Sequence, residues 1–113
     1  MLVTAIVLFA IGAVGGLILA SSVLRDKFAP WALSMLHALL GAAGLIVLIV
    51  MVVQGSTSSR LIAALGLLIV AALGGFFLAS FHLRQRIPAK GVVIAHAGLA
   101  VIGFLTLLSL LLY

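Results

Sequence analysis

The sequence predicts an all-α protein: a transmembrane four-helix up-down-up-down bundle built from two tandem helical hairpins. Three observations support this prediction. The 113 residues are 67% hydrophobic, whereas a soluble domain is roughly half apolar. Four apolar runs cover about residues 2–24, 30–53, 61–83 and 89–112, and each is close to the roughly 20 residues that cross a bilayer as a helix. A pattern of small residues, arginine and histidine occurs twice, 59 positions apart.

The internal repeat is clearest between residues 12–44 and 71–103, where 12 of 33 aligned residues are identical without a gap. Both copies contain Gly-Gly, Leu-Ala-Ser, Leu-Arg and His-Ala in the same order. We therefore expect a single transmembrane domain over residues 1–113, with repeat 1 at about 1–54 and repeat 2 at about 60–113. Because each copy holds two spans, the copies should share one orientation across the membrane.

Basic residues and prolines mark the ends of the spans. The first span ends before Arg25 and the third before Arg84, and the second and fourth begin near Pro30 and Pro88. Proline suits the first turn of a helix, because its missing N–H would have no partner there. The connections within each copy are short, so consecutive helices should be antiparallel neighbours, with the second and fourth diagonally opposite.

The six basic residues predict the orientation of the chain. Only Arg60 lies in the middle connection, and the first and third connections hold the others, Arg25, Lys27, Arg84, Arg86 and Lys90. Basic loops face the cytoplasm, so we expect a multi-pass protein with both termini on the periplasmic side. The net charge of +5 thus follows membrane topology, and we assign no nucleic-acid partner, only membrane lipid.

Two histidines, His37 and His96, lie inside apolar runs, each about two turns into its span. An ionisable side chain at membrane depth is costly and is by default a functional-site hypothesis. The repeat places the two histidines at equal depth on diagonal helices, where both can point at the bundle axis. This arrangement suits the two axial ligands of one haem iron.

The residues around the histidines favour a porphyrin. A flat macrocycle needs small neighbours, and its propionates need cations. The residues expected at the site are the repeated arginines and six glycines: Arg25, Arg84, Gly15, Gly16, Gly41, Gly74, Gly75 and Gly98. His82, two residues before Arg84, is expected at the interface, with a secondary role beside a propionate or a quinone headgroup.

Other classes of function are alternatives to this hypothesis. Membrane histidines can have a purely structural role, as hydrogen-bond partners between helices. A proton or ion pathway is a further alternative. A small multidrug transporter needs a carboxylate inside the membrane, but the one acidic residue, Asp26, lies in a loop. Cysteine is absent, which excludes thiolate sites. Zinc or copper would be under-coordinated by two histidines, although His82 could add a third ligand, and no hydrolytic constellation is present.

The segments LHALLG (36–41) and AHAGLA (95–100) resemble those of the four-helix bis-histidine b-type cytochromes of bacterial inner membranes. The resemblance implies one-electron transfer with a quinol or a partner redox subunit, and one haem b held by His37 and His96. Those cytochromes commonly carry two haems on four histidines, whereas this chain has three. The implied location is the bacterial inner membrane, in a larger complex or a homo-oligomer. The alternative is a cofactor-free accessory subunit that stabilises a larger membrane complex.

Overall fold

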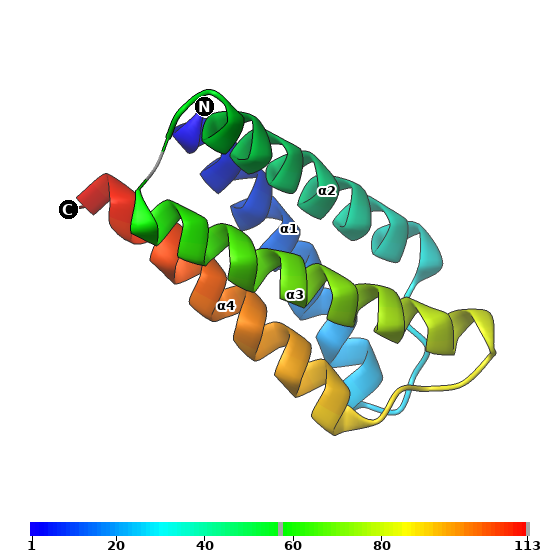
Figure 1. Ribbon diagram of the computed structural model, residues 1–113. Coiled ribbons are helices and arrows are strands. Elements are labelled where there is room, and N and C mark those ends of the chain that lie inside the picture. The colour runs from blue at the N-terminus through cyan, green and yellow to red at the C-terminus, as the bar shows by residue number, and fades with distance from the viewer. Residues whose placement is uncertain (57, 113) are drawn as a thin grey trace.

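The computed structural model describes residues 1–56 and 58–112, and within them the chain forms four α-helices and no strand. The helices are α1 (Leu2–Leu24), α2 (Trp31–Val53), α3 (Ser59–Leu83) and α4 (Lys90–Leu112) (Figure 1). All four are long and apolar enough to cross a membrane. The predicted all-α, four-helix fold is confirmed, and each predicted span agrees with its helix to within two residues at either end.

The helices form an elongated bundle of 43 × 21 × 19 Å. α1 packs mainly on α2, and α3 packs mainly on α4, while the α1–α4 and α2–α3 interfaces are smaller. Helices α2 and α4 are therefore diagonal, as predicted. Both termini and the α2–α3 connection lie at one end, and the α1–α2 and α3–α4 connections lie at the other (Figure 1).

The first three helices end in the same hydrogen-bonded reversal. After α1, Asp26 has a left-handed backbone, with φ of 60°. The N–H groups of Asp26 and Lys27 donate to carbonyls in the last turn of α1 at 2.9 and 3.0 Å, which is the Schellman motif. Gln85 (φ 55°) makes the same reversal after α3, and Gly55 (φ 106°) makes it after α2. These tight ends allow the next helix to pack directly against the one before.

Helix α3 begins two residues before the predicted apolar run. Ser58 is its N-cap, and the hydroxyl of Ser58 accepts a hydrogen bond from the N–H of Leu61 at 3.5 Å. A serine cap satisfies one of the otherwise unpaired N–H groups of the first turn. Hydropathy alone does not register such a cap, so the predicted start at residue 61 was late.

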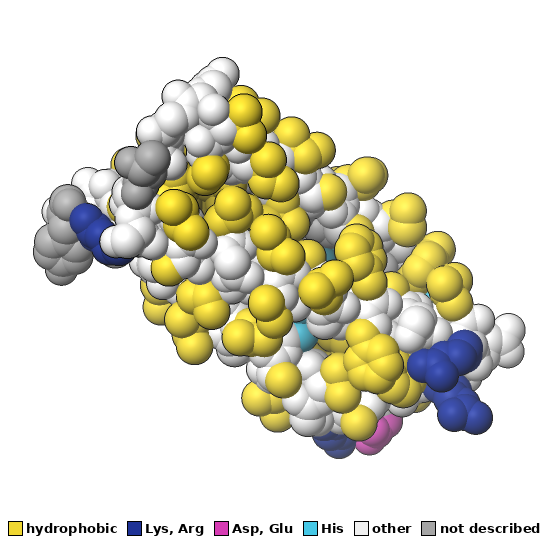
Figure 2. Space-filling model, in the orientation of Figure 1, with side chains coloured by type: hydrophobic (Ala, Val, Ile, Leu, Met, Phe, Trp, Pro, Cys, Tyr) yellow, Lys and Arg dark blue, Asp and Glu magenta, His cyan; other side chains and the backbone are white. Residues whose placement is uncertain are grey.

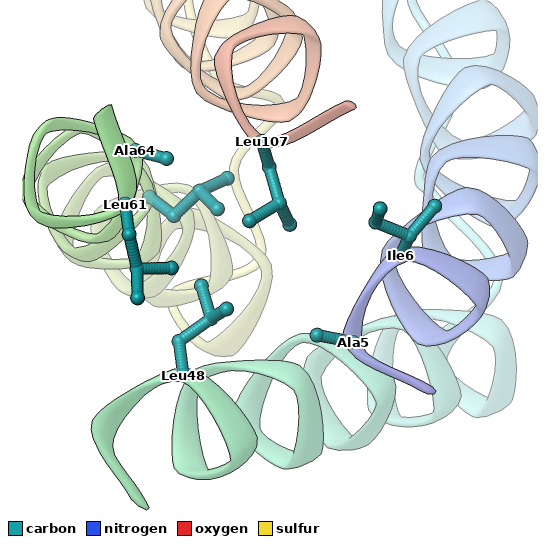
Figure 3. Close-up of a cluster of buried hydrophobic side chains, with 7 residues drawn as sticks. Ala5, Ile6, Leu48, Leu61, Ala64 and Leu107 are labelled. Atoms are coloured by element: carbon teal, nitrogen blue, oxygen red, sulfur yellow. The ribbon is translucent and has the colours of Figure 1, made fainter. Parts of the chain in front are cut away.

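The hydrophobic core occupies the half of the bundle near the termini (Figure 3). All four helices contribute to its buried members, which are Ala5, Ile6, Leu48, Leu61, Ala64, Leu68 and Leu107. Phe9 packs against this cluster and fills the space beside Gly44, where a Cβ would lie 2.7 Å from the ring. Among the described residues, the layer of the bundle that contains His37 and His96 contributes no side chain to this cluster.

The outer surface is apolar along the sides and charged at the ends (Figure 2). Exposed aliphatic side chains such as Leu17, Leu39 and Leu73 suit contact with lipid. Five basic residues mark the end with the α1–α2 and α3–α4 connections, called the basic end from here on: Arg25, Lys27, Arg84, Arg86 and Lys90. At the opposite end, Arg60 donates to the carbonyl and the hydroxyl of Ser109, both at 3.2 Å.

Candidate functional site

His37 on α2 and His96 on α4 face one another across the bundle. Their ring centroids are 6.3 Å apart, and the ring planes are inclined at 82°. Both side chains are half-buried. The structure thus brings together the two histidines that the repeat predicted to lie on diagonal helices.

Each imidazole is held by a backbone carbonyl on the other helix of its own hairpin. The Nδ1 atom of His37 lies 2.8 Å from the carbonyl oxygen of Gly12, and Nδ1 of His96 lies 2.7 Å from that of Ala71. A carbonyl can only accept, so Nδ1 carries the proton and donates it, which leaves the lone pair of a neutral ring on Nε2. Neither Nε2 atom has a hydrogen-bond partner among the described residues.

Two glycines leave room for the histidine rings. A Cβ on Gly16 would lie 2.9 Å from Cε1 of His37, and a Cβ on Gly75 would lie 3.2 Å from Cε1 of His96. Any larger residue would displace the ring that it faces. Small residues at such places let a side chain or a second helix approach the backbone closely. Gly16 and Gly75 therefore lie directly against the two histidine rings.

The other predicted glycines differ in how they relate to the histidines. A Cβ on Gly74 would lie 3.6 Å from Nδ1 of His96, whereas a Cβ on Gly15 would meet a leucine of α2 at 3.7 Å. A Cβ on Gly41 or Gly98 would meet no atom within 4 Å. Gly98 is also exposed on the outer surface, so the structure does not bring it to the histidine pair.

Arg25 and Arg84 lie at the ends of their own helices. The Nε of Arg25 donates to the carbonyl of Ser21 at 3.0 Å, and the Nε of Arg84 donates to that of Ser80 at 3.2 Å. Cations are favourable at helix C-termini. Nine residues, about 13 Å of helix rise, separate each arginine from the glycine that faces a histidine. Their predicted contact with the propionates of a haem stays a prediction.

His82 lies at the basic end and joins the two hairpins. Its ring stacks on Trp31 of α2 with centroids 4.5 Å apart, and meets the ring of Phe28 edge-on at 5.6 Å. His82 is seven residues beyond Gly75 along α3, roughly 10 Å by helix rise. It is therefore not a third member of the histidine pair.

An apolar hollow of about 410 Å³ runs along the α1–α2 seam and reaches His37. Histidine is the one ionisable residue in its lining, and the other lining residues are Ile11, Val14, Gly15, Ile18, Leu33, Leu36 and Leu40. Several of these side chains are half exposed, so the hollow opens on the lipid-facing side of the hairpin. An apolar molecule dissolved in the bilayer can approach His37 along this route.

The donor set suits a haem better than a bare metal ion. No group of three or more His, Cys, Asp or Glu side chains that could hold a metal occurs in the part of the chain that is described, so tetrahedral zinc lacks ligands. A haem iron needs only two protein ligands, because the porphyrin provides the rest. Two imidazoles on opposite sides of one ion, with bonds of about 2 Å, have centroids roughly 6 Å apart, close to the observed 6.3 Å.

Comparison of the chain with protein-family models, with curated proteins and with solved structures found no match. The interpretation of the site therefore rests on its residues and their geometry.

Sequence reasoning missed the carbonyls of Gly12 and Ala71, because a backbone acceptor has no signature in residue type. The spacing of these two acceptors in the repeat is a pattern that could have indicated them. Each acceptor lies 25 residues before its histidine and one helical turn before the glycine that faces the ring, in both copies. The stacking of Trp31 on His82 was also not predicted.

Proposed function

We propose that this protein is a small membrane-embedded b-type haem protein that transfers single electrons, with one haem held by His37 and His96. The observation that carries the proposal is the facing histidine pair, in which both Nδ1 atoms donate to carbonyls. Both Nε2 lone pairs are thereby left for a metal. A purely structural histidine needs one such hydrogen bond, but it has no need of a second histidine opposite it.

The chain's own residues would orient and tune the ligands. When bound, a haem supplies an iron that alternates between two oxidation states. The carbonyls of Gly12 and Ala71 fix the tautomer and rotation of the rings and make Nε2 more basic. Gly16 and Gly75 set how far each ring stands from the neighbouring helix. With His37 and His96 both bound to it, the iron would have no position left for oxygen.

The packing of the bundle is consistent with a cofactor in the histidine layer. The hydrophobic core closes the half near the termini, and the contacts of His82 with Trp31 and Phe28 join the hairpins at the basic end. The histidine layer lies between these two regions. Its rings meet across the bundle instead of being separated by core side chains.

The proposed electron partner is a membrane quinol or the redox subunit of a larger complex. The apolar hollow along α1 and α2 gives a lipid-soluble quinol a route toward His37. The proposed location is the bacterial inner membrane, with the basic end in the cytoplasm and both termini in the periplasm. A partner subunit or a second copy of the chain would provide the other redox centre.

The test of this function is anaerobic reduction of the oxidised, purified protein by a short-chain quinol, followed in the visible spectrum. We expect reduction by the quinol, and slower reduction in Leu36→Trp, which fills the hollow but keeps both histidines. If dithionite reduces the protein but the quinol does not, the electron donor is a protein partner. If the protein never binds haem, the remaining function is that of a cofactor-free accessory subunit.

A further inference from the structure

A hollow of about 400 Å³ lies at the basic end between the two hairpins, lined by Phe28, His82 and Gln85. Phe28 comes from the connection between α1 and α2, whereas His82 and Gln85 come from the last turn of α3 and the connection after it. Trp31 stacks on the ring of His82. A molecule seated in this hollow would therefore touch both hairpins at once.

The polar groups that line the hollow are available to a ligand. In residues 1–56 and 58–112, neither the imidazole of His82 nor the side-chain amide of Gln85 makes a hydrogen bond. His82 is half-buried, and Gln85 is exposed. Both side chains can donate N–H groups to an oxygen. The lining thus offers donors to an acceptor-rich group beside two aromatic rings.

The charge around the hollow favours an anion. The basic end has five basic residues and one acidic residue, Asp26, which leaves a net charge of +4. Asp26 forms an exposed ion pair with Lys90 at 3.6 Å, so the one carboxylate is already engaged. Anionic lipids are attracted to basic segments at the membrane surface, and the attraction amounts to about 1 kcal/mol per Lys or Arg.

We propose that this hollow binds the phosphate headgroup of an anionic phospholipid, which joins the two hairpins from the membrane surface. His82 and Gln85 donate to the phosphate oxygens, and the basic residues supply the charge. The exposed Leu24 and Leu83 at the ends of α1 and α3 offer apolar surface to the acyl chains. Trp31 is of the type that sits at headgroup depth, and the ring of Phe28 adds an apolar wall beside His82.

The repeat limits this site to one per chain. Copy 1 has Val23 at the position equivalent to His82, and Val23 is buried. The proposed lipid site includes neither of the facing histidines. It assigns to the third histidine a role that electron transfer does not require.

The experiment uses Trp31, the single tryptophan of the chain, as a reporter beside the hollow. Purified protein in detergent is titrated with phosphatidylglycerol, phosphatidylcholine or glycerol phosphate while Trp31 emission is followed, and lipid retained in native mass spectra gives a second readout. We expect a saturable response to phosphatidylglycerol, with binding about tenfold weaker in His82→Val because a hydrogen bond to a charged group is lost. Arg60→Gln, at the opposite end, should bind like the unmodified chain.

Equal responses to phosphatidylglycerol and phosphatidylcholine would overturn the proposal. Undiminished binding of phosphatidylglycerol by His82→Val in both readouts would overturn it as well. An equal response to glycerol phosphate would show that the site takes free phosphate esters, and the lipid assignment would then be wrong.

Discussion

His37 and His96 each donate from one ring nitrogen to a backbone carbonyl, so the rotation of each ring is fixed from within its own hairpin. A hydrogen bond between membrane helices contributes only about 0.6 kcal/mol on average, so this bond alone explains little of the stability. Its larger effect is on direction, because it determines where Nε2 points. Metal-binding histidines are oriented by the same kind of carbonyl contact.

The orientation of the rings predicts a magnetic signature for the oxidised haem protein. Ring planes inclined at 82° and held by carbonyls should remain close to perpendicular when both rings bind iron. We expect the highly anisotropic low-spin signal of perpendicular imidazoles in electron paramagnetic resonance. The rhombic signal of parallel imidazoles would show that the rings leave the observed geometry on binding.

Gly16→Ala and Gly75→Ala should weaken haem binding, because each new Cβ would lie within 3.2 Å of a histidine ring and push Nε2 out of place. Changes to groups that orient metal ligands typically cost 10- to 100-fold in affinity, and about tenfold is expected here in a haem titration of the apoprotein. Gly98→Ala is the matched control, since its Cβ meets nothing. Equal haem affinity in all three variants would contradict the proposed role of Gly16 and Gly75 in the haem site.

The sequence predicted that the two histidines lie on diagonal helices with small residues near them, but it did not predict the carbonyl acceptors. The prediction for Gly98 neglected helix geometry. A residue two positions beyond His96 lies about 200° around the helix, which is the opposite face. Gly41, four positions beyond His37, does share its face. Residue type alone cannot distinguish these two glycines, whereas helix periodicity can.

The helix ends show how the hairpins are closed. Asp26 and Gln85 occupy equivalent positions of the repeat, and both adopt left-handed backbones that usually belong to glycine. The polar residues of the two connections predicted loops but not this motif, because Asp and Gln are not its usual signature. The third reversal has the expected glycine, Gly55. The Ser58 cap was missed because the spans were located by hydropathy.

Gln85→Gly should stabilise the protein. Glycine adopts a left-handed backbone without the Cβ contact that costs other residues about 1 kcal/mol. We expect the free energy of unfolding in detergent, from helical circular dichroism, to rise by about this amount. Gln54→Gly is the control, because Gln54 has φ of −79° and no left-handed strain to relieve. Equal effects of the two substitutions would show that the strain at Gln85 is negligible.

The whole molecule is a bundle with its hydrophobic core at one end and aromatic and ionic contacts between hairpins at the other. Span number, helix order and the diagonal placement of α2 and α4 could be predicted from hydropathy and loop length. The position of the hydrophobic core could not be predicted from them. Helices that are apolar all round show no hydrophobic stripe, so their patterns do not tell which face points inward.

The orientation of the bundle can be tested by cysteine labelling, because the chain has no cysteine of its own. Gln54→Cys lies in the α2–α3 connection, and Ala89→Cys lies beside α4 at the basic end; both positions are exposed. If the basic end lies in the cytoplasm, as proposed, a membrane-impermeant maleimide added to intact cells should label Gln54→Cys and not Ala89→Cys. The reverse pattern would place the basic end outside.

Haem binding by His37 and His96 is tested most simply by the visible spectrum of the protein purified from haem-replete cells. The protein is oxidised and then reduced with dithionite, and haem is quantified as the pyridine haemochrome. We expect a low-spin b-type spectrum with about one haem per chain. The colour should be lost in His37→Ala and in His96→Ala but kept in His82→Ala. A protein that is colourless, and stays colourless after added hemin, would contradict haem binding by His37 and His96.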